Sequence, residues 1–216
     1  MTSSSERKGA TGRAGDGGLT DRQAGRSLSP KQETRRARVI DAALRLAAEG
    51  GYEAVQMRDI ARNADVALGT VYHYFTSKDH LLAEAMAVRA ASLSQRVDRR
   101  PLEGAAPADR LRDYYDRACR ALECEPELTA ALVTALVSAD SAVALSVGRV
   151  TTQVASAVSA VLQGHFEPEE CDEIAGVLGH VWFSSLISWA SGRREIAEVS
   201  LELRRAIAVV CRQPGR

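Results

Sequence analysis

Hydrophobic side chains recur at helical spacing along most of this chain of 216 residues. In the first such stretch the apolar positions are Val39, Ile40, Ala43, Leu44 and Ala47. That spacing places them on one face of an α-helix, and similar stripes follow in later segments. The alternation of apolar and polar residues that marks a strand, bounded by turn residues, does not occur. The pattern predicts an all-α fold with about nine helices.

Residues that favour helix ends divide these stripes into segments. Ser29 and Pro30 suit the cap and the first position of a first helix, and Gly50-Gly51 is expected to end it. Ser77 is expected to cap a long fourth helix. Further helix starts are predicted at Pro107, Pro126, Asp140 and Pro168.

Two short helices are predicted between the first and the fourth, one with the apolar stripe Met57, Ile60, Ala61 and Ala64 and one from about Ala67 to Phe75. Two helices joined by a short turn form a helix-turn-helix, whose second helix fits the DNA major groove. Packing of Val71 and Phe75 toward the first helix leaves the other side chains of the second short helix facing outward. These are Leu68, Gly69, Thr70, Tyr72, His73 and Tyr74.

The outward residues carry groups that DNA accepts. Thr70 offers a hydroxyl and a methyl group suited to a base edge, whereas Tyr72 and His73 can donate to phosphates. For each tyrosine, half-buried packing is the alternative explanation. For Gly69, two explanations are equally open: close approach of the backbone to a groove wall, or tight contact with the first helix.

Basic residues flank this segment. Arg58 and Lys78 stand at helix starts, where a cation and the helix N-terminus can address one phosphate together. Arg36, with Arg35 and Arg38 beside it, lines the first turns of the first helix and is expected to reach the flanking DNA backbone. A solvated charged face is the alternative for this arginine run.

The segment GGYEAVQMRDIARNADVALGTVYHYFTSKDHLL resembles the DNA-binding domain of the TetR family of bacterial repressors, over Gly50 to about Met86. The offsets of R-D-I-A, G-T-x-Y-x-Y-F and S-K-x-x-L agree with the family pattern. Gln56 and Ala67 depart from it, because many members have Ser or Thr at these helix caps. The resemblance implies that the following residues contact DNA: Gln56, Arg58, Leu68, Gly69, Thr70, Tyr72, His73 and Lys78.

The resemblance also implies three regions. Residues 1–28 are polar and Gly/Ser-rich and are expected to form a disordered arm. Residues 29–76 form the helix-turn-helix domain, and residues 77–216 form a ligand-binding and dimerisation domain. The family reads palindromic operators as homodimers through the last two helices. In those helices the residues predicted at the dimer interface are Trp189, Val199, Leu203 and Ile207.

The helix expected over 140–165 is rich in Ser, Thr, Ala and Val. Small side chains leave room either for close helix packing or for an apolar ligand, and both explanations are open. Within the family, GGYEAVQMR and VWFSSLISWASGRR are similar to segments of a repressor of cholesterol catabolism. This similarity implies a hydrophobic effector, a steroid or other lipid acyl-CoA. The predicted cavity residues are Leu82, Met86, Val147, Thr151, Val154, Trp182, Phe183 and Leu186.

Charge is balanced overall, with 28 Lys and Arg against 28 Asp and Glu. Residues 1–80 are nevertheless mildly basic, which agrees with a front end that contacts double-stranded DNA. The four cysteines show no metal-binding spacing, and neither a metal site nor a cofactor is expected. The longest uncharged stretch, around 175–190, is shorter than a membrane span, so we expect no membrane partner and a cytoplasmic location.

Catalytic motifs such as H-E-x-x-H and G-x-S-x-G do not occur in the sequence, and no catalytic residue is predicted. The chain is therefore expected to be a ligand-responsive repressor and not an enzyme. The alternatives are an all-helical protein-interaction module or a small helical enzyme, neither of which would bind DNA.

Overall fold

The computed structural model describes the backbone of residues 28–212, and their side chains except at 93, 94 and 96–98. The predicted arm over 1–28 therefore lies outside the described residues, apart from Leu28. The described part is all-α, with nine helices and no strand. These are α1 (Pro30–Ala54), α2 (Met57–Asn63), α3 (Leu68–Tyr74), α4 (Lys78–Arg99), α5 (Pro107–Glu123), α6 (Pro126–Leu136), α7 (Ser141–Leu162), α8 (Pro168–Ala190) and α9 (Ile196–Val210).

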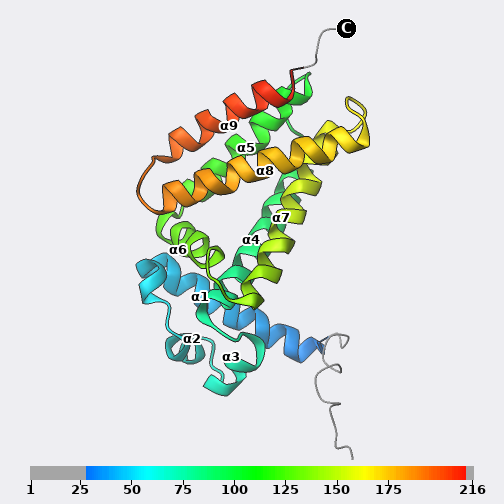
Figure 1. The fold of residues 1–216 in the computed structure, drawn as a ribbon. Helices are drawn as coiled ribbons and strands as arrows, with labels where there is room; N and C mark the ends of the chain where they lie inside the picture. Colours follow the sequence, from blue (N-terminus) through cyan, green and yellow to red (C-terminus); the bar gives the residue numbers. More distant parts are fainter. Residues whose placement is uncertain (1–27, 213–216) are drawn as a thin grey trace, which may run out of the picture.

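The helices are arranged along one long direction of the molecule. Figure 1 shows α1, α2 and α3 at one end and α5, α8 and α9 at the other, with α4, α6 and α7 between them. Helix α1 packs mainly on α6 and α4, whereas α9 packs on α8 and α5. The long helices α4 and α7 therefore connect the small front group to the larger back group.

Two hydrophobic cores match this arrangement. The front core joins side chains of α1, α2 and α3 to side chains of α4, α6 and the start of α7, with Phe75, Leu82 and Leu132 among its buried members. The back core is formed by α5, α7, α8 and α9. The front core thus extends beyond residue 76, because α1 needs α4 and α6 to cover its apolar face.

The predicted helix boundaries hold at most positions. Ser29 forms a capping box with Gln32 at the start of α1, and Asp140 caps α7 through the backbone N–H of Ala142. The Ser77 hydroxyl accepts a hydrogen bond of 3.0 Å from the His80 backbone N–H, which caps α4.

The backbone is non-helical at the glycine pair where the first helical run was predicted to end. The helix kinks at Gly50 and Gly51 and then continues for one more turn to Ala54. Gly51 has φ 66° and ψ −160°, a conformation that is open almost only to glycine. At Gly50 a Cβ atom would lie 2.7 Å from the Ala54 Cβ. The glycine pair therefore ends the first regular run, as predicted, and a further short turn leads to Ala54.

Candidate functional site

The helix-turn-helix is held by packing and by one arginine. Ile60 and Val71, from its two helices, are fully buried. In the turn, Asp65 adopts φ 50°, which its short polar side chain tolerates. The Arg38 guanidinium donates to the carbonyl of Ala64 and, at 3.0 Å, to that of Asp65. Arg38 thus stabilises the turn, in addition to any role at the DNA backbone.

Most of the residues predicted to face outward on α3 are open to solvent, but Tyr74 is half-buried and packs against the front core. The Tyr72 side chain is 51% exposed, and Gly69 and His73 are exposed beside it. Leu68 and Thr70 are half-buried at the edge of this face. We call these five residues the α3 reading face.

Gly69 has open space where a side chain would stand. A Cβ atom built at this position meets no other atom within 4 Å, outside its own helix backbone and chain neighbours. The structure therefore excludes tight contact with α1, one of the two explanations left open by the sequence. Close approach to a groove wall remains.

The two helices of this unit begin without side-chain caps. Gln56 and Ala67 occupy the cap positions of α2 and α3, and neither side chain accepts a hydrogen bond from its helix N-terminus. Gln56 instead donates at 3.1 Å to the Glu53 carbonyl. Gln56 and Arg58 are both exposed near the start of α2, where they are free to meet a ligand.

Lys78 lies on the ring of Tyr52. Its Nζ atom is 3.6 Å from the ring centroid and donates at 3.2 Å to the Tyr52 carbonyl. The Tyr52 hydroxyl donates to Asp79, and burial together with that carboxylate raises the pKa of Tyr52 to about 12. These contacts fix the start of α4 against the last turn of α1.

Arg36 has a different environment from the one predicted. Its guanidinium forms an ion pair with Glu84 on α4 and lies 5.3 Å from the centroid of the Phe75 ring. Burial lowers the pKa of Arg36. Because this side chain is turned into the contact between α1 and α4, we no longer assign Arg36 to the DNA-contacting set.

Glu84 is the centre of a charged cluster that joins three helices. It is 6% exposed, and one carboxylate oxygen binds Arg36 of α1. The other oxygen accepts a hydrogen bond of 2.6 Å from the hydroxyl of Ser146 and pairs with Arg149, both on α7. We call these four residues the Glu84 cluster. Ser77 and Asp140 form a second link between α4 and α7, with a hydrogen bond of 2.6 Å.

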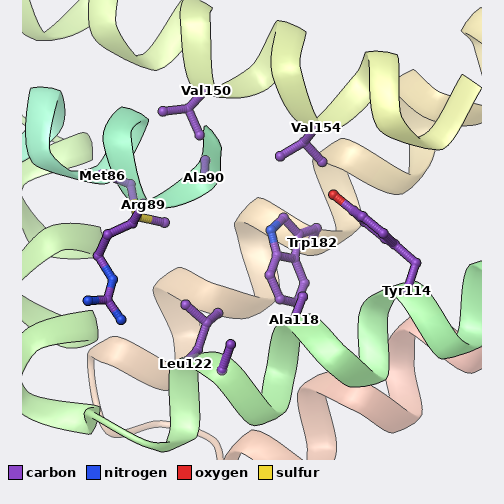
Figure 2. A pocket seen from close by; sticks show the side chains of 10 residues that line it. Met86, Arg89, Ala90, Tyr114, Ala118, Leu122, Val150, Val154 and Trp182 are labelled. Carbon is purple, nitrogen blue, oxygen red and sulfur yellow. The ribbon is translucent and has the colours of Figure 1, made fainter. Parts of the chain in front are cut away.

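An apolar cavity lies farther along the same helices (Figure 2). Its volume is about 60 Å³, or about 580 Å³ when the adjoining open solvent is counted. Its walls are formed by α4, α5, α7 and α8. The lining residues are Met86, Arg89, Ala90, Tyr114, Ala118, Ala121, Leu122, Val150, Val154 and Trp182.

Three of the eight predicted cavity residues line it: Met86, Val154 and Trp182. Leu82, Val147 and Phe183 belong to the front core or pack against it, and Leu186 is buried in the back core. Thr151 is exposed to solvent and does not line the cavity. These five residues were therefore misplaced by the sequence prediction.

The sequence prediction missed the wall formed by α5. Tyr114, Ala118 and Ala121 lie on one face of that helix, at a spacing that marks an apolar stripe. Periodicity reveals such a stripe but does not tell whether it faces a core or a cavity. At the mouth, Arg89 pairs with Glu125 at 2.6 Å.

The predicted dimer residues are mostly internal. Val199, Leu203 and Ile207 are fully buried in the back core, because α9 turns this stripe toward α5 and α8. Trp189 is half-buried and lies beside an open groove between α6 and the kink of α1. The large apolar side chains left exposed on α8 and α9 are Val177, Leu201 and Val209.

The chain belongs to the TetR family. Residues 39–85 match the family of bacterial regulatory proteins named after TetR, and residues 104–210 match a tetracyclin repressor-like C-terminal domain. The helix-turn-helix at the front and the helical back group are the two parts that these matches cover. The chain is accordingly a transcriptional regulator and not an enzyme.

Several relatives of the chain are repressors named KstR. The chain is 37% identical to the HTH-type transcriptional repressor KstR of Mycobacterium tuberculosis over 182 residues, which cover 84% of this chain and 83% of KstR. The KstR of Rhodococcus jostii is 34% identical over 210 residues, which cover 97% of this chain and 96% of that one. The sequence resemblance to this repressor, KstR, is thereby confirmed.

Solved structures show the same fold. A TetR regulator from Rhodococcus sp. RHA1 superposes with a TM-score of 0.75 at 28% identity, covering 86% of this chain and all of that one. FadR of Thermus thermophilus, solved with lauroyl-CoA, superposes with a TM-score of 0.65 at 22% identity, covering 84% of this chain and 95% of FadR.

Proposed function

We propose that this regulator is a repressor that binds a palindromic DNA operator as a homodimer and is released by a hydrophobic effector. The effector is a steroid or other lipid acyl-CoA. One observation carries this proposal: α4 lines the cavity with Met86 and Arg89 and also holds α1 through Glu84 and Arg36. The same helix therefore contacts both the cavity and the DNA-reading unit.

The α3 reading face is the DNA-contacting surface in this proposal. Thr70 and the backbone at Gly69 meet base edges, and Tyr72 and His73 donate to phosphates. Arg58 and Gln56 reach the DNA backbone from α2. Lys78, held by Tyr52, contributes its charge at the start of α4. We retain residues 29–76 as the DNA-binding region and residues 77–216 as the sensing and dimerisation region.

The effector class follows from the chemistry of the cavity. Most lining side chains are aliphatic or aromatic, and the charged group among them is Arg89 at the mouth. Such a site suits a lipid body with an anionic end, because the apolar part is desolvated while the anion takes the place of Glu125 at the Arg89 guanidinium. The lauroyl-CoA of Thermus thermophilus FadR has this chemistry.

Release requires that the effector bind one arrangement of the helices better than the other. A lipid body inserted between Met86 of α4 and Val150 of α7 pushes the two helices apart. The Glu84 cluster joins the same helices nearer the front, so their separation strains the contacts with Ser146 and Arg149. Glu84 then moves with α4 and shifts α1 through Arg36, which changes the spacing of the two reading faces in the dimer.

The dimer interface is assigned to the outward faces of α8 and α9. These faces carry Val177, Leu201 and Val209 in an exposed position, which costs free energy in a monomer. No membrane partner is proposed. Helix α7 is apolar and long enough to span a bilayer, but it packs here against α4 and α8 and pairs its Arg149 with Glu84. A cytoplasmic location accords with this function.

Operator binding by the full chain tests the proposal. Fluorescence anisotropy is measured with the DNA upstream of the protein's own gene, at several salt concentrations, with and without lauroyl-CoA or the CoA thioester of a sterol acid. We expect affinity that falls linearly with log salt and that drops when a thioester binds. A thioester that binds the protein without changing operator affinity would count against effector release. The absence of any salt-dependent DNA binding would refute the repressor itself.

A further inference from the structure

The α5 wall of the cavity carries a polar group without a partner. The Tyr114 side chain is 4% exposed, and within residues 28–212 its hydroxyl has no hydrogen bond. Figure 2 shows this hydroxyl turned toward Val154 and Trp182, with Arg89 on the far side of Trp182. A ligand that fills the cavity would seal this hydroxyl from water, and leaving it unpaired there would be costly.

The Tyr114 hydroxyl can form a hydrogen bond with either a hydroxyl or a carbonyl oxygen. Burial raises the pKa of Tyr114 to about 12, so the phenol stays protonated at neutral pH and can donate or accept. Around it, Ala118, Val150 and Val154 offer no side-chain hydrogen bonds. The Trp182 indole N–H can donate only. Within the described part of the chain, Tyr114 thus supplies the one side-chain acceptor oxygen of the cavity wall.

The neighbouring Tyr115 has a hydroxyl that does not face the cavity, in contrast to Tyr114. The Tyr115 hydroxyl, unlike that of Tyr114, is fully buried without a hydrogen-bond partner, and Tyr115 is not among the cavity-lining residues. It packs in the back core, with its ring 5.4 Å from that of Trp182 and 5.1 Å from that of Tyr114. The two hydroxyls differ in what they can reach, because a ligand in the cavity meets the first and not the second.

We propose that Tyr114 is a specificity-determining residue that hydrogen-bonds a hydroxyl or carbonyl oxygen on the lipid part of the effector. The inference rests on the proposed function, since it takes the cavity as the effector site with the anionic end at Arg89. A plain hydrocarbon at this position leaves the phenol unpaired, so the cavity favours an oxygenated lipid. The effector is then a lipid acyl-CoA thioester whose lipid part carries a further oxygen, remote from the CoA end.

Two probes that differ by one hydroxyl test this inference. Calorimetric titration of the full chain compares the CoA thioester of 5β-cholanic acid with that of its 3-hydroxy derivative. We expect the hydroxylated thioester to bind the unmodified protein about tenfold more tightly, the range of one hydrogen bond to a neutral group in a desolvated site. In Tyr114→Phe the preference disappears, because only the phenolic oxygen is removed.

Tyr115→Phe is the matched control, since it deletes a neighbouring buried hydroxyl outside the cavity. It should keep the tenfold preference, and thermal unfolding should show that both variants are folded. Equal binding of the two thioesters by the unmodified protein would overturn the proposed role of Tyr114 but not the proposed effector class. So would an unchanged preference in Tyr114→Phe. Binding of neither thioester would overturn the effector class and this inference together.

Discussion

Arg36 and Arg38 stand two positions apart on α1, carry the same charge, and have different partners. Arg36 turns into the contact with α4 and binds Glu84, whereas Arg38 binds the turn of the helix-turn-helix at Ala64 and Asp65. Two residues along a helix rotate the side chain by about 200°. Both arginines therefore support the position of the reading unit, and neither needs DNA to be satisfied.

Arg58 has no such internal partner within the described residues, and it is exposed near the start of α2. Arg58→Ala should weaken operator binding about tenfold, because a charge-assisted contact to a phosphate is lost. It should also reduce the salt slope by about one, since one counterion fewer is released. Fluorescence anisotropy across salt concentrations measures both quantities.

Arg120→Ala is the control for that variant. Arg120 is equally exposed, but it lies on α5, far from α3 in Figure 1. The same charge change there should leave affinity and salt slope unchanged. Equal losses in both variants would mean that Arg58 acts only through net charge.

At the residue scale the sequence predicted some positions correctly and others not. Tyr72 and Gly69 were correctly placed on the open face of α3, because the packing of Val71 on one side of a short helix leaves the other side exposed. Arg36 was misassigned because its partner, Glu84, lies 48 residues later and belongs to another helix. Ion pairs of this kind depend on tertiary packing, which side-chain periodicity does not contain.

At the scale of the helix, α3 begins in a geometry that suits a cap but lacks one. Ala67 has φ −65° and ψ 145°, and no side chain accepts a hydrogen bond from the first turn. Ala67→Ser should stabilise the protein by about 1 kcal/mol, because its hydroxyl can accept from a free backbone N–H. This gain corresponds to about 2–4 °C in Tm for a chain of this size.

Differential scanning calorimetry of the serine variant measures the gain. Ala67→Val is the control, since valine adds apolar volume but no acceptor and should not stabilise. If both variants raise Tm equally, the effect comes from packing and not from the cap.

The apolar faces of helices were easier to predict from the sequence than the elements against which those faces pack. The stripe of Val199, Leu203 and Ile207 was read correctly as apolar, yet it faces α5 and α8 of the same chain. Leu201, on another face of α9, is the exposed one. A stripe predicts that a face is buried, and only the fold decides whether the partner is the same chain or a second copy.

At the scale of the whole molecule, the Glu84 cluster connects the front and back groups. Glu84→Gln keeps the size of the side chain but removes the charge that Arg36 and Arg149 share. Both arginines remain partly exposed, at 29% and 60% of their side chains, so solvent limits the loss. We expect a decrease of about 1–2 kcal/mol in the free energy of unfolding, measured by urea denaturation.

The same variant should also weaken the response of operator affinity to a bound thioester, because α7 loses its charged contact with α4. Glu103→Gln is the control, since Glu103 pairs with Arg100 on the surface, where both are more than 70% exposed. It should change the unfolding free energy by less than about 0.5 kcal/mol. A Glu84→Gln protein with normal stability and a normal response would show that the cluster does not connect the two groups.

The dimer proposal is tested at Leu201, which is 48% exposed on α9. Leu201→Glu should convert the dimer to monomers, because a charge placed in an apolar interface is desolvated without a partner. Operator affinity should fall at least about tenfold, since two linked reading faces bind better than one. Sedimentation velocity and anisotropy measure the two effects.

Leu145→Glu is the control for the dimer. Leu145 is more exposed, at 74%, but it lies on α7 close to the front group. It should remain dimeric. A Leu201→Glu protein that sediments as a dimer would move the interface to another surface.

The front core, which passes from α1 through α4 and α6 to Val143 of α7, has a consequence for the engineering of biosensors. A chimaera that joins residues 29–76 to a sensor from another regulator would cut through this core and expose its apolar side chains. A soluble graft must carry the first halves of α4 and α7 and the whole of α6 with the transplanted unit. The exchangeable unit therefore consists of segments that are not contiguous in the sequence. Suitable junctions lie only in the second halves of α4 and α7, beyond the front core.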